Sequence, residues 1–78
     1  MNVQAYILVQ TEVGTAGDVT RAIAAIPGVT LAEDVTGPYD VIVRAEAPTM
    51  DDLGRTILGG IQKVPGITRT LTCPVVHL

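Results

Sequence analysis

Few side chains in this sequence have the types and spacing that enzyme chemistry requires. The chain has no serine, and its one cysteine, Cys73, is separated from its one histidine, His77, by Pro74 and two valines. A thiolate nucleophile needs a base within reach and a third group that orients the base. A free cysteine more often packs as a small apolar side chain. We therefore expect neither catalysis nor metal binding at this pair.

Four of the eight carboxylates form two adjacent pairs, Glu33-Asp34 and Asp51-Asp52. In a strand, neighbouring side chains face opposite sides, so Glu33 and Asp34 cannot act together as an acid/base dyad. Asp51 and Asp52 fall in the expected first turn of a helix, where negative charge complements the helix dipole. No glycine-rich loop has the spacing of a phosphate cradle. The sequence therefore predicts no catalytic residue, no metal site and no cofactor.

One segment offers groups for binding: Thr36-Gly37-Pro38-Tyr39-Asp40. Gly-Pro and Asp are common in turns, so a hairpin loop with the tyrosine packed across it accounts for these residues. Alternatively, Gly37 and its backbone neighbours bind a small polar ligand. Tyr39 would then add an apolar wall with a polar tip, and Asp40 would accept a hydrogen bond from an ammonium group. On the residues alone, both interpretations stay open.

Hydrophobic periodicity predicts four strands and two helices around this segment. Alternating apolar residues favour strands over 3–11 and 40–47, and weaker patterns favour strands over 29–36 and 67–73. Helices are expected to start at Thr15 and Thr49, each followed three residues later by an aspartate. Each helix is expected to end at a Pro-Gly pair. The glycines of the second helix should permit its close packing on the sheet.

The expected order of elements is strand, helix, strand, strand, helix, strand. The sequence also contains an internal repeat. Residues 23–30 (IAAIPGVT) resemble residues 61–68 (IQKVPGIT), which indicates one strand–helix–strand unit used twice. This pattern predicts an α+β, ferredoxin-like βαββαβ fold, a two-layer sandwich with both helices on one face of an antiparallel sheet. The first and third strands should be central in that sheet.

The sheet face away from the helices is expected to be largely neutral. Residues expected there are Tyr6, Leu8, Ala32, Ile42, Thr68, Thr70 and Thr72. An uncovered face of an antiparallel sheet would normally carry alternating polar residues. We therefore expect a second copy of the chain to cover this face in a twofold homodimer.

Composition agrees with an oligomer and argues against several partners. A single domain of 78 residues and 8.1 kDa is marginal alone, and one cysteine cannot form an intrachain disulfide. Five basic against eight acidic residues and two aromatic residues predict no direct nucleic-acid binding. No apolar run is long enough for a membrane span, and no signal peptide is evident. We expect a cytoplasmic protein without membrane contact.

The turn and its surroundings resemble the ligand-binding regulatory (RAM-type) domain of the leucine-responsive and asparagine regulator (Lrp/AsnC) transcription factors. The resemblance is carried by Gly37-Pro38-Tyr39-Asp40 between the second and third strands and by the turns Pro27-Gly28 and Pro65-Gly66, and it covers the chain from 1 to 78. The Gly-x-Tyr-Asp turn is its most specific part. The helix-turn-helix domain that precedes this domain in the family has no counterpart in the sequence.

This resemblance implies a fold of the dimeric α+β barrel type and a stand-alone domain that regulates transcription. It implies sheet-to-sheet homodimers that assemble into rings, from tetramer to decamer, with amino-acid effectors bound between dimers. The implied ligand-binding residues are Thr36, Gly37, Pro38, Tyr39 and Asp40, with Thr70 and Thr72 chosen as polar groups of the last strand. Full-length Lrp/AsnC regulators are implied partners.

Two alternatives to an amino-acid-binding module remain at this stage. One is a small dimeric ferredoxin-like enzyme of the monooxygenase or isomerase type, which would need a polar group in an apolar cavity. The near absence of aromatic residues to shape such a cavity weighs against it. The other is a purely structural assembly unit whose turn binds nothing.

Overall fold

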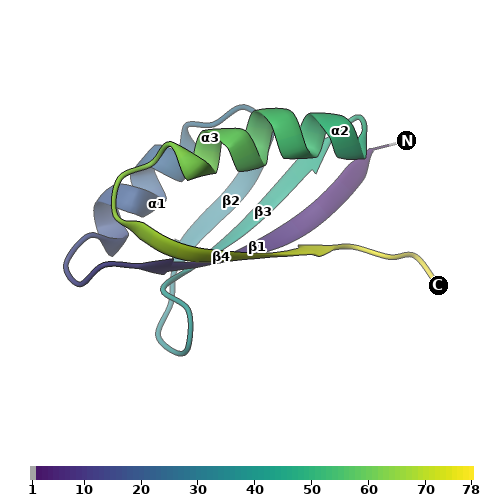
Figure 1. The fold of residues 1–78 in the computed structure, drawn as a ribbon. Helices are drawn as coiled ribbons and strands as arrows, with labels where there is room; N and C mark the ends of the chain where they lie inside the picture. The colour runs from purple at the N-terminus through teal and green to yellow at the C-terminus, as the bar shows by residue number, and fades with distance from the viewer. Residues whose placement is uncertain (1) are drawn as a thin grey trace.

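The computed structural model describes residues 2–78 and has two layers, a four-stranded sheet and helices on one of its faces (Figure 1). The elements in chain order are β1 (Val3–Thr11), α1 (Ala16–Ala24), β2 (Val29–Asp34), β3 (Val41–Ala47), α2 (Met50–Asp52), the π-helical segment η1 (Leu53–Leu58), α3 (Gly59–Gln62) and β4 (Ile67–Pro74). Because α2, η1 and α3 run on as one helix, the expected βαββαβ order is confirmed.

The strands lie in the order β2-β3-β1-β4, and every pairing is antiparallel. The two most apolar strands, β1 and β3, are therefore central, as the sequence predicted. Their register places Ile7 opposite Val43 and Leu8 opposite Ile42. Since side chains alternate along a strand, Ile7 and Leu8 belong to opposite faces of the sheet.

The core lies entirely between the sheet and the helices. Its fully enclosed side chains are apolar without exception among the described residues, and they comprise Ala5, Ile7, Val9, Val19, Ile23, Val41, Val43, Ala45, Ala47, Leu53, Ile57 and Ile61. Alternate positions of β1 and β3 meet the i, i+4 stripes of the two helices in this layer. One face of the sheet is thus sealed by the chain itself.

The second helix begins with a side-chain cap and widens in its middle. Thr49 precedes α2, and its hydroxyl accepts a hydrogen bond from the Asp52 backbone amide at 3.1 Å, as the capping pattern predicted. Thr15, at the start of α1, makes no such cap. In η1 the helix widens to π geometry, and at its end the Gly59 amide donates to the Gly54 carbonyl five residues earlier. The sequence did not predict this wide turn.

Glycine is required at Gly28, where the chain leaves α1 for β2. Its φ is +97°, a conformation that side-chain-bearing residues rarely adopt. An added Cβ would lie 2.8 Å from the Glu46 carbonyl oxygen and 2.8 Å from Cδ1 of Ile57. Gly28 therefore allows β2, β3 and the second helix to meet closely. By contrast, Gly60 of α3 approaches Ile26 rather than the sheet, so our expectation of glycine-mediated packing on the sheet was wrong there.

The register of β4 corrects part of the expected outer face. Thr70 lies opposite Val9 and Thr72 opposite Ile7, and both partners are core residues. Ala32 likewise lies opposite Val43 and packs against the core. These three residues therefore face the helices, contrary to the prediction. The sequence expectation placed β4 and β2 one residue out of phase, which inverts the faces of a strand.

Candidate functional site

The connection between β2 and β3 is a loop that projects beyond the sheet, away from the helices (Figure 1). Its base is closed by a hydrogen bond from the Val35 amide to the Asp40 carbonyl, at 2.9 Å. The Asp40 amide donates to the carbonyl of Val9 on β1, also at 2.9 Å. The loop is thus fixed at its base and open at its tip.

Asp40 fastens the loop to the end of β1. Its Oδ2 accepts hydrogen bonds from the Thr11 backbone amide at 2.8 Å and from the Thr11 hydroxyl at 3.3 Å. Hydrogen bonds to a carboxylate are among the stronger ones in proteins, so this contact is a local anchor. Asp40 therefore has a structural role in the turn, which the sequence left open, but its partner Thr11 was not predicted.

The tip of the loop presents backbone to solvent. Thr36, Gly37 and Pro38 are exposed. Gly37 has a φ of +145°, and an added Cβ would meet nothing within 4 Å. The side-chain amide of Gln10 donates to the Pro38 carbonyl at 2.9 Å. The tip is accessible to another molecule, and one of its carbonyls is already bonded within the chain.

The predicted site residues separate into two groups. Tyr39 and Asp40 are half-buried and belong to the same loop as Thr36, Gly37 and Pro38. Thr70 and Thr72 lie on β4, which β1 separates from β3, and they face the helices. Two strand spacings amount to about 10 Å. Within one copy of the chain, the two threonines and the loop do not form one site.

The sequence reasoning missed the two residues of β1 that hold the loop, Gln10 and Thr11. Their contacts join residues about thirty positions apart in the chain, so no local motif links them to the turn. The only available signal was the antiparallel pairing of β1 with β3. That pairing brings the end of β1 beside the start of β3.

The sheet face opposite the helices carries an apolar patch. We call it the outer patch; it consists of Tyr6, Leu8, Leu31, Ile42 and Leu71. Tyr6 is 39%, Leu31 43% and Leu71 44% exposed, while Leu8 and Ile42 are half-buried. The registers place these residues on one face, with Leu8 between Ile42 and Leu71.

Polar side chains border the outer patch in pairs. An Arg44 guanidinium nitrogen donates to the Tyr6 hydroxyl at 3.0 Å, and the guanidinium carbon lies 5.4 Å from the centre of the Tyr6 ring. The Gln4 amide donates to a Glu46 carboxylate oxygen at 2.9 Å. The expected neutral outer face is therefore present, with different members on β2 and β4 than predicted.

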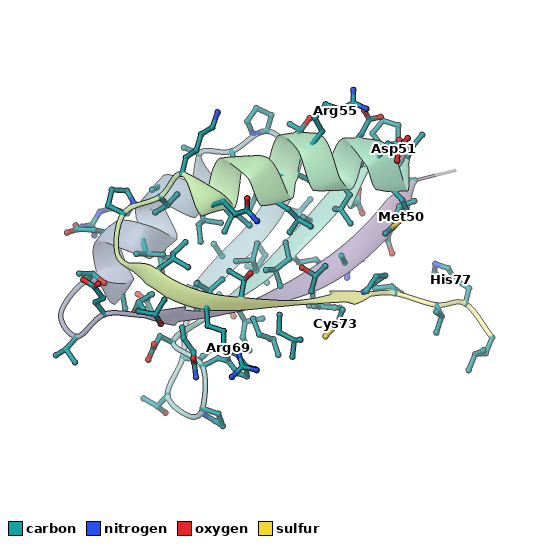
Figure 2. The ribbon with its side chains drawn as sticks, viewed as in Figure 1. Met50, Asp51, Arg55, Arg69, Cys73 and His77 are labelled. Atoms are coloured by element: carbon teal, nitrogen blue, oxygen red, sulfur yellow. The ribbon has the colours of Figure 1, made fainter. Side chains whose placement is uncertain are left out.

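Cys73 and His77 lie apart from the loop between β2 and β3. Cys73 is a free, exposed thiol on the outer face of β4, and His77 lies in the tail that runs past the sheet (Figure 2). Among residues 2–78, no three His, Cys, Asp or Glu side chains gather as a metal site would require. No helix in this range combines the length and apolar character that crossing a membrane requires.

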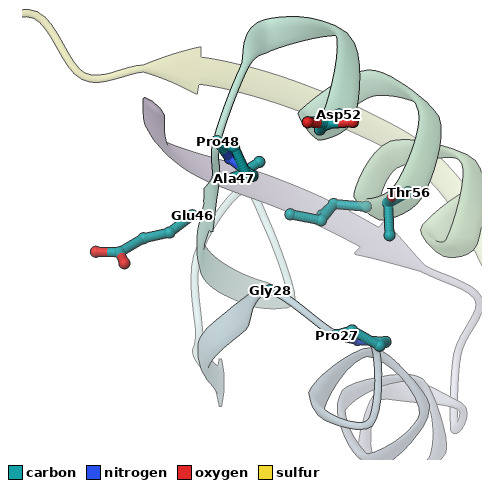
Figure 3. Close-up of a pocket in the computed structure, with 8 residues that line it drawn as sticks. Pro27, Gly28, Glu46, Ala47, Pro48, Asp52 and Thr56 are labelled. Carbon is teal, nitrogen blue, oxygen red and sulfur yellow. The ribbon is translucent and has the colours of Figure 1, made fainter. Parts of the chain in front are cut away.

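A pocket lies at the other end of β3. It measures about 400 Å³ and is lined by Pro27, Gly28, Glu46, Ala47, Pro48, Asp52, Thr56 and Ile57 (Figure 3). Its residues come from the turn after α1, the end of β3 and the second helix. The sequence reasoning did not single out this place.

Comparison with known proteins gives a family-level match. The family model described as the Lrp/AsnC ligand binding domain matches residues 4–77. A homocitrate synthase of Sulfurisphaera tokodaii is 36% identical over 72 residues, which cover 91% of this chain and 15% of that protein. An uncharacterized HTH-type transcriptional regulator of Pyrococcus horikoshii is 29% identical over 58 residues, 74% of this chain and 39% of that protein. The chain thus spans well under half of either relative.

Solved structures, one of similar length and two about twice as long, also match. A hypothetical protein from Pyrococcus horikoshii has a TM-score of 0.87 and 37% identity, covering 97% of this chain and 92% of its own. AsnC of Escherichia coli has a TM-score of 0.88 at 21% identity, covering 97% of this chain and 52% of its own. A transcriptional regulator of Neisseria meningitidis, solved as an L-Met complex, has a TM-score of 0.82 at 19% identity, with coverages of 96% and 50%. At these last two identities the likeness shows a shared fold.

Proposed function

The chain belongs to the Lrp/AsnC ligand-binding domain family, and on that premise we propose that it is an oligomeric, non-catalytic module that binds an amino-acid effector at the loop between β2 and β3. The observation that carries this proposal is the loop itself: residues 36–38 are exposed, while Asp40 and Gln10 fix their position. A fixed loop with accessible backbone binds a ligand at a low cost in conformational entropy.

The loop forms only one side of a binding site. Small-molecule sites usually bury most of the ligand between several walls, and within residues 2–78 the pocket lies elsewhere. A second copy that brings its own loop or helix against this one would complete the enclosure. The proposal therefore needs an assembly larger than one chain, with the effector bound between dimers.

The outer patch supports the dimer from which such an assembly would be built. Three large apolar side chains stand about 40% exposed on one face of the sheet, and Leu8 and Ile42 extend the patch across the central strands. A twofold dimer would bury the same patch of both copies. We propose that such dimers associate further into rings through the ends that carry the loops.

The match to homocitrate synthase is compatible with this module. It covers 15% of that enzyme, and we infer that the shared part is a ligand-binding domain rather than the catalytic part. The tip residues Thr36, Gly37 and Pro38 include no side chain that could act as a base to activate a nucleophile. We also propose that the chain affects transcription by co-assembling with a DNA-binding regulator of the same family.

A thermal-shift screen of the oligomer against the twenty amino acids tests this proposal. A ligand that binds only the folded state stabilises it by RT ln(1 + [L]/Kd), about 2.7 kcal/mol at a hundred times Kd. We expect at least one amino acid to raise Tm, and Thr36→Val or Tyr39→Ala to reduce the shift while the oligomer persists. If the oligomer forms and no amino acid shifts Tm at millimolar concentration, the loop is an assembly element instead.

A further inference from the structure

The pocket at the far end of β3 has features of a second ligand site, independent of the loop. β3 runs seven residues from Val41 to Ala47, and at about 3.4 Å per residue this separates the two places by about 20 Å. The pocket volume of about 400 Å³ lies near the lower end of the range for small-molecule sites. Residues of a single chain form it, without a second copy.

The floor of the pocket is apolar and belongs to the packed core. Ile57 is 1% and Ala47 6% exposed, and both belong to the core of the domain. Pro27 and Pro48 lie at the rim, and the ring of each proline restricts its backbone φ angle. Gly28 lies between them, and an added Cβ at Gly28 would approach Ile57. This floor suits the hydrocarbon part of a small molecule.

The charged side chains that line the pocket are both acidic. Figure 3 shows the Asp52 carboxylate and the Thr56 side chain on the helical wall, above the floor, while the Glu46 side chain points away. Glu46 is instead bonded to Gln4. Asp52 is half-buried, and its Oδ2 accepts from the Thr49 hydroxyl at 3.0 Å, which fixes the carboxylate. No lysine or arginine lines the pocket.

The π-helical segment forms the wall that carries these groups. Ile57 and Thr56 lie within η1, Leu53–Leu58, directly after Asp52. Such wide turns are uncommon and often occur at functional sites, because they change the direction of the side chains that follow. Here the buried Ile57 and the exposed Thr56 of this segment both line the pocket. The pocket and the irregular helix are therefore separate observations at the same place.

We propose that this pocket binds a small primary alkylammonium compound, with its ammonium group at Asp52 and Thr56 and its alkyl chain on Ile57, Ala47 and the two prolines. Charge complementarity selects the cation, because Asp52 is the acidic side chain on the helical wall and no basic residue lines the pocket to oppose it. The apolar floor selects a short, uncharged chain in the rest of the ligand.

Titration of the full chain with n-pentylammonium, followed by two-dimensional amide NMR, tests the proposal. We expect saturable shifts at Gly28, Ala47, Asp52 and Thr56, and an affinity that increases about four-fold for each methylene from propylammonium to pentylammonium. Pentanol and pentanoate should bind at least ten-fold more weakly, because they lack the positive charge. Equal binding of the three compounds, or shifts scattered over the surface, would overturn the proposal.

Two aspartates of the same helical turn provide a matched pair of variants. Asp51 is exposed and does not line the pocket, whereas Asp52 does. Asp52→Asn should weaken pentylammonium binding about ten-fold, while Asp51→Asn removes the same charge from the same turn and should change binding less than two-fold. Equal losses in both variants would reduce the effect to general electrostatic attraction and contradict a site.

A third variant keeps the test decisive if Asp52→Asn unfolds the helix start. Thr56 is exposed, so Thr56→Arg should leave the fold intact and place a cation at the rim. We expect it to abolish pentylammonium binding. Retained affinity in Thr56→Arg would rule out this pocket as the site. Neither variant touches the loop between β2 and β3, so amino-acid binding there can fail or succeed separately.

Discussion

The two faces of the sheet differ in how their apolar side chains are covered. Ile7 and Leu8 are adjacent in β1, yet Ile7 is completely buried beneath the helices and Leu8 lies in the outer patch. The helices of the same chain bury the apolar side chains of the helix face. The outer face keeps apolar side chains about 40% exposed, with Arg44 and Gln4 bonded along its border. The helix face is thus packed within one chain, whereas we propose that the outer face packs against a second copy.

The strongest effect is expected from truncation on the helix face. Ile7→Ala should lower the free energy of unfolding by about 2–5 kcal/mol, because it leaves a cavity in a fully enclosed core. Chemical denaturation monitored by circular dichroism measures the change. Leu8→Ala is the matched control from the other face, and in dilute, monomeric protein it should cost less than half as much. Equal losses would mean that the two faces do not differ.

The next effect concerns association rather than folding. Leu8→Glu places a charge at the centre of the outer patch, between Ile42 and Leu71. Burying that charge in a dimer is unfavourable, so the dimer dissociation constant should rise at least about a hundred-fold, or about 2.7 kcal/mol. Sedimentation velocity measures the association and circular dichroism the fold. An unchanged dimer would show that another surface mediates it.

A smaller effect is expected at the base of the loop. Asp40→Ala removes the acceptor for the Thr11 amide and hydroxyl, and should cost about 1–3 kcal/mol, since hydrogen bonds to charged groups contribute that much. Amide hydrogen exchange at Thr11 should become faster. Thr11→Val is the control that keeps the backbone donor and removes the hydroxyl. Unchanged exchange in Asp40→Ala would mean that backbone bonds alone fix the loop.

The smallest effect concerns the threonines that the sequence assigned to the ligand. Thr72 faces the helices opposite Ile7 and is half-buried, so Thr72→Val should change stability by no more than about 0.5 kcal/mol. It should also leave amino-acid binding unchanged, whereas Thr36→Val at the loop should weaken it. Denaturant melts and the thermal-shift screen measure the two quantities. Loss of binding in Thr72→Val would restore this residue to the ligand site.

The fold was predictable because local and global signals agreed. The alternation in residues 3–11, the Thr49 cap and the two Pro-Gly turns each fixed an element or its end, and the repeat fixed the topology. The faces of β2 and β4 were not predictable. Thr70 and Thr72 alternate with Arg69, Leu71 and Cys73, and neither set is apolar enough to choose the core side. Only the pairing of β4 with β1 decides which of these two sets faces the helices.

The sequence pointed to the segment of the candidate site, but not to the contacts that hold this segment in place. The Gly-x-Tyr-Asp turn marked the loop, yet its anchors on β1 are distant in sequence. The pocket beside Pro48 gave no sequence signal either, since prolines, an alanine and a capping aspartate are ordinary at element ends. The wide turn in η1 departs from the periodicity of 3.6 residues on which the helix prediction rested.

The central claim is that amino-acid binding occurs at the loop of an assembled protein. Isothermal titration of the oligomer with the amino acid that most raises Tm tests it most directly, comparing the natural chain with the Leu8→Glu variant. The account predicts saturable binding by the assembled chain and its loss in the folded, dissociated variant. Binding of equal affinity to both forms, or to neither, would contradict it.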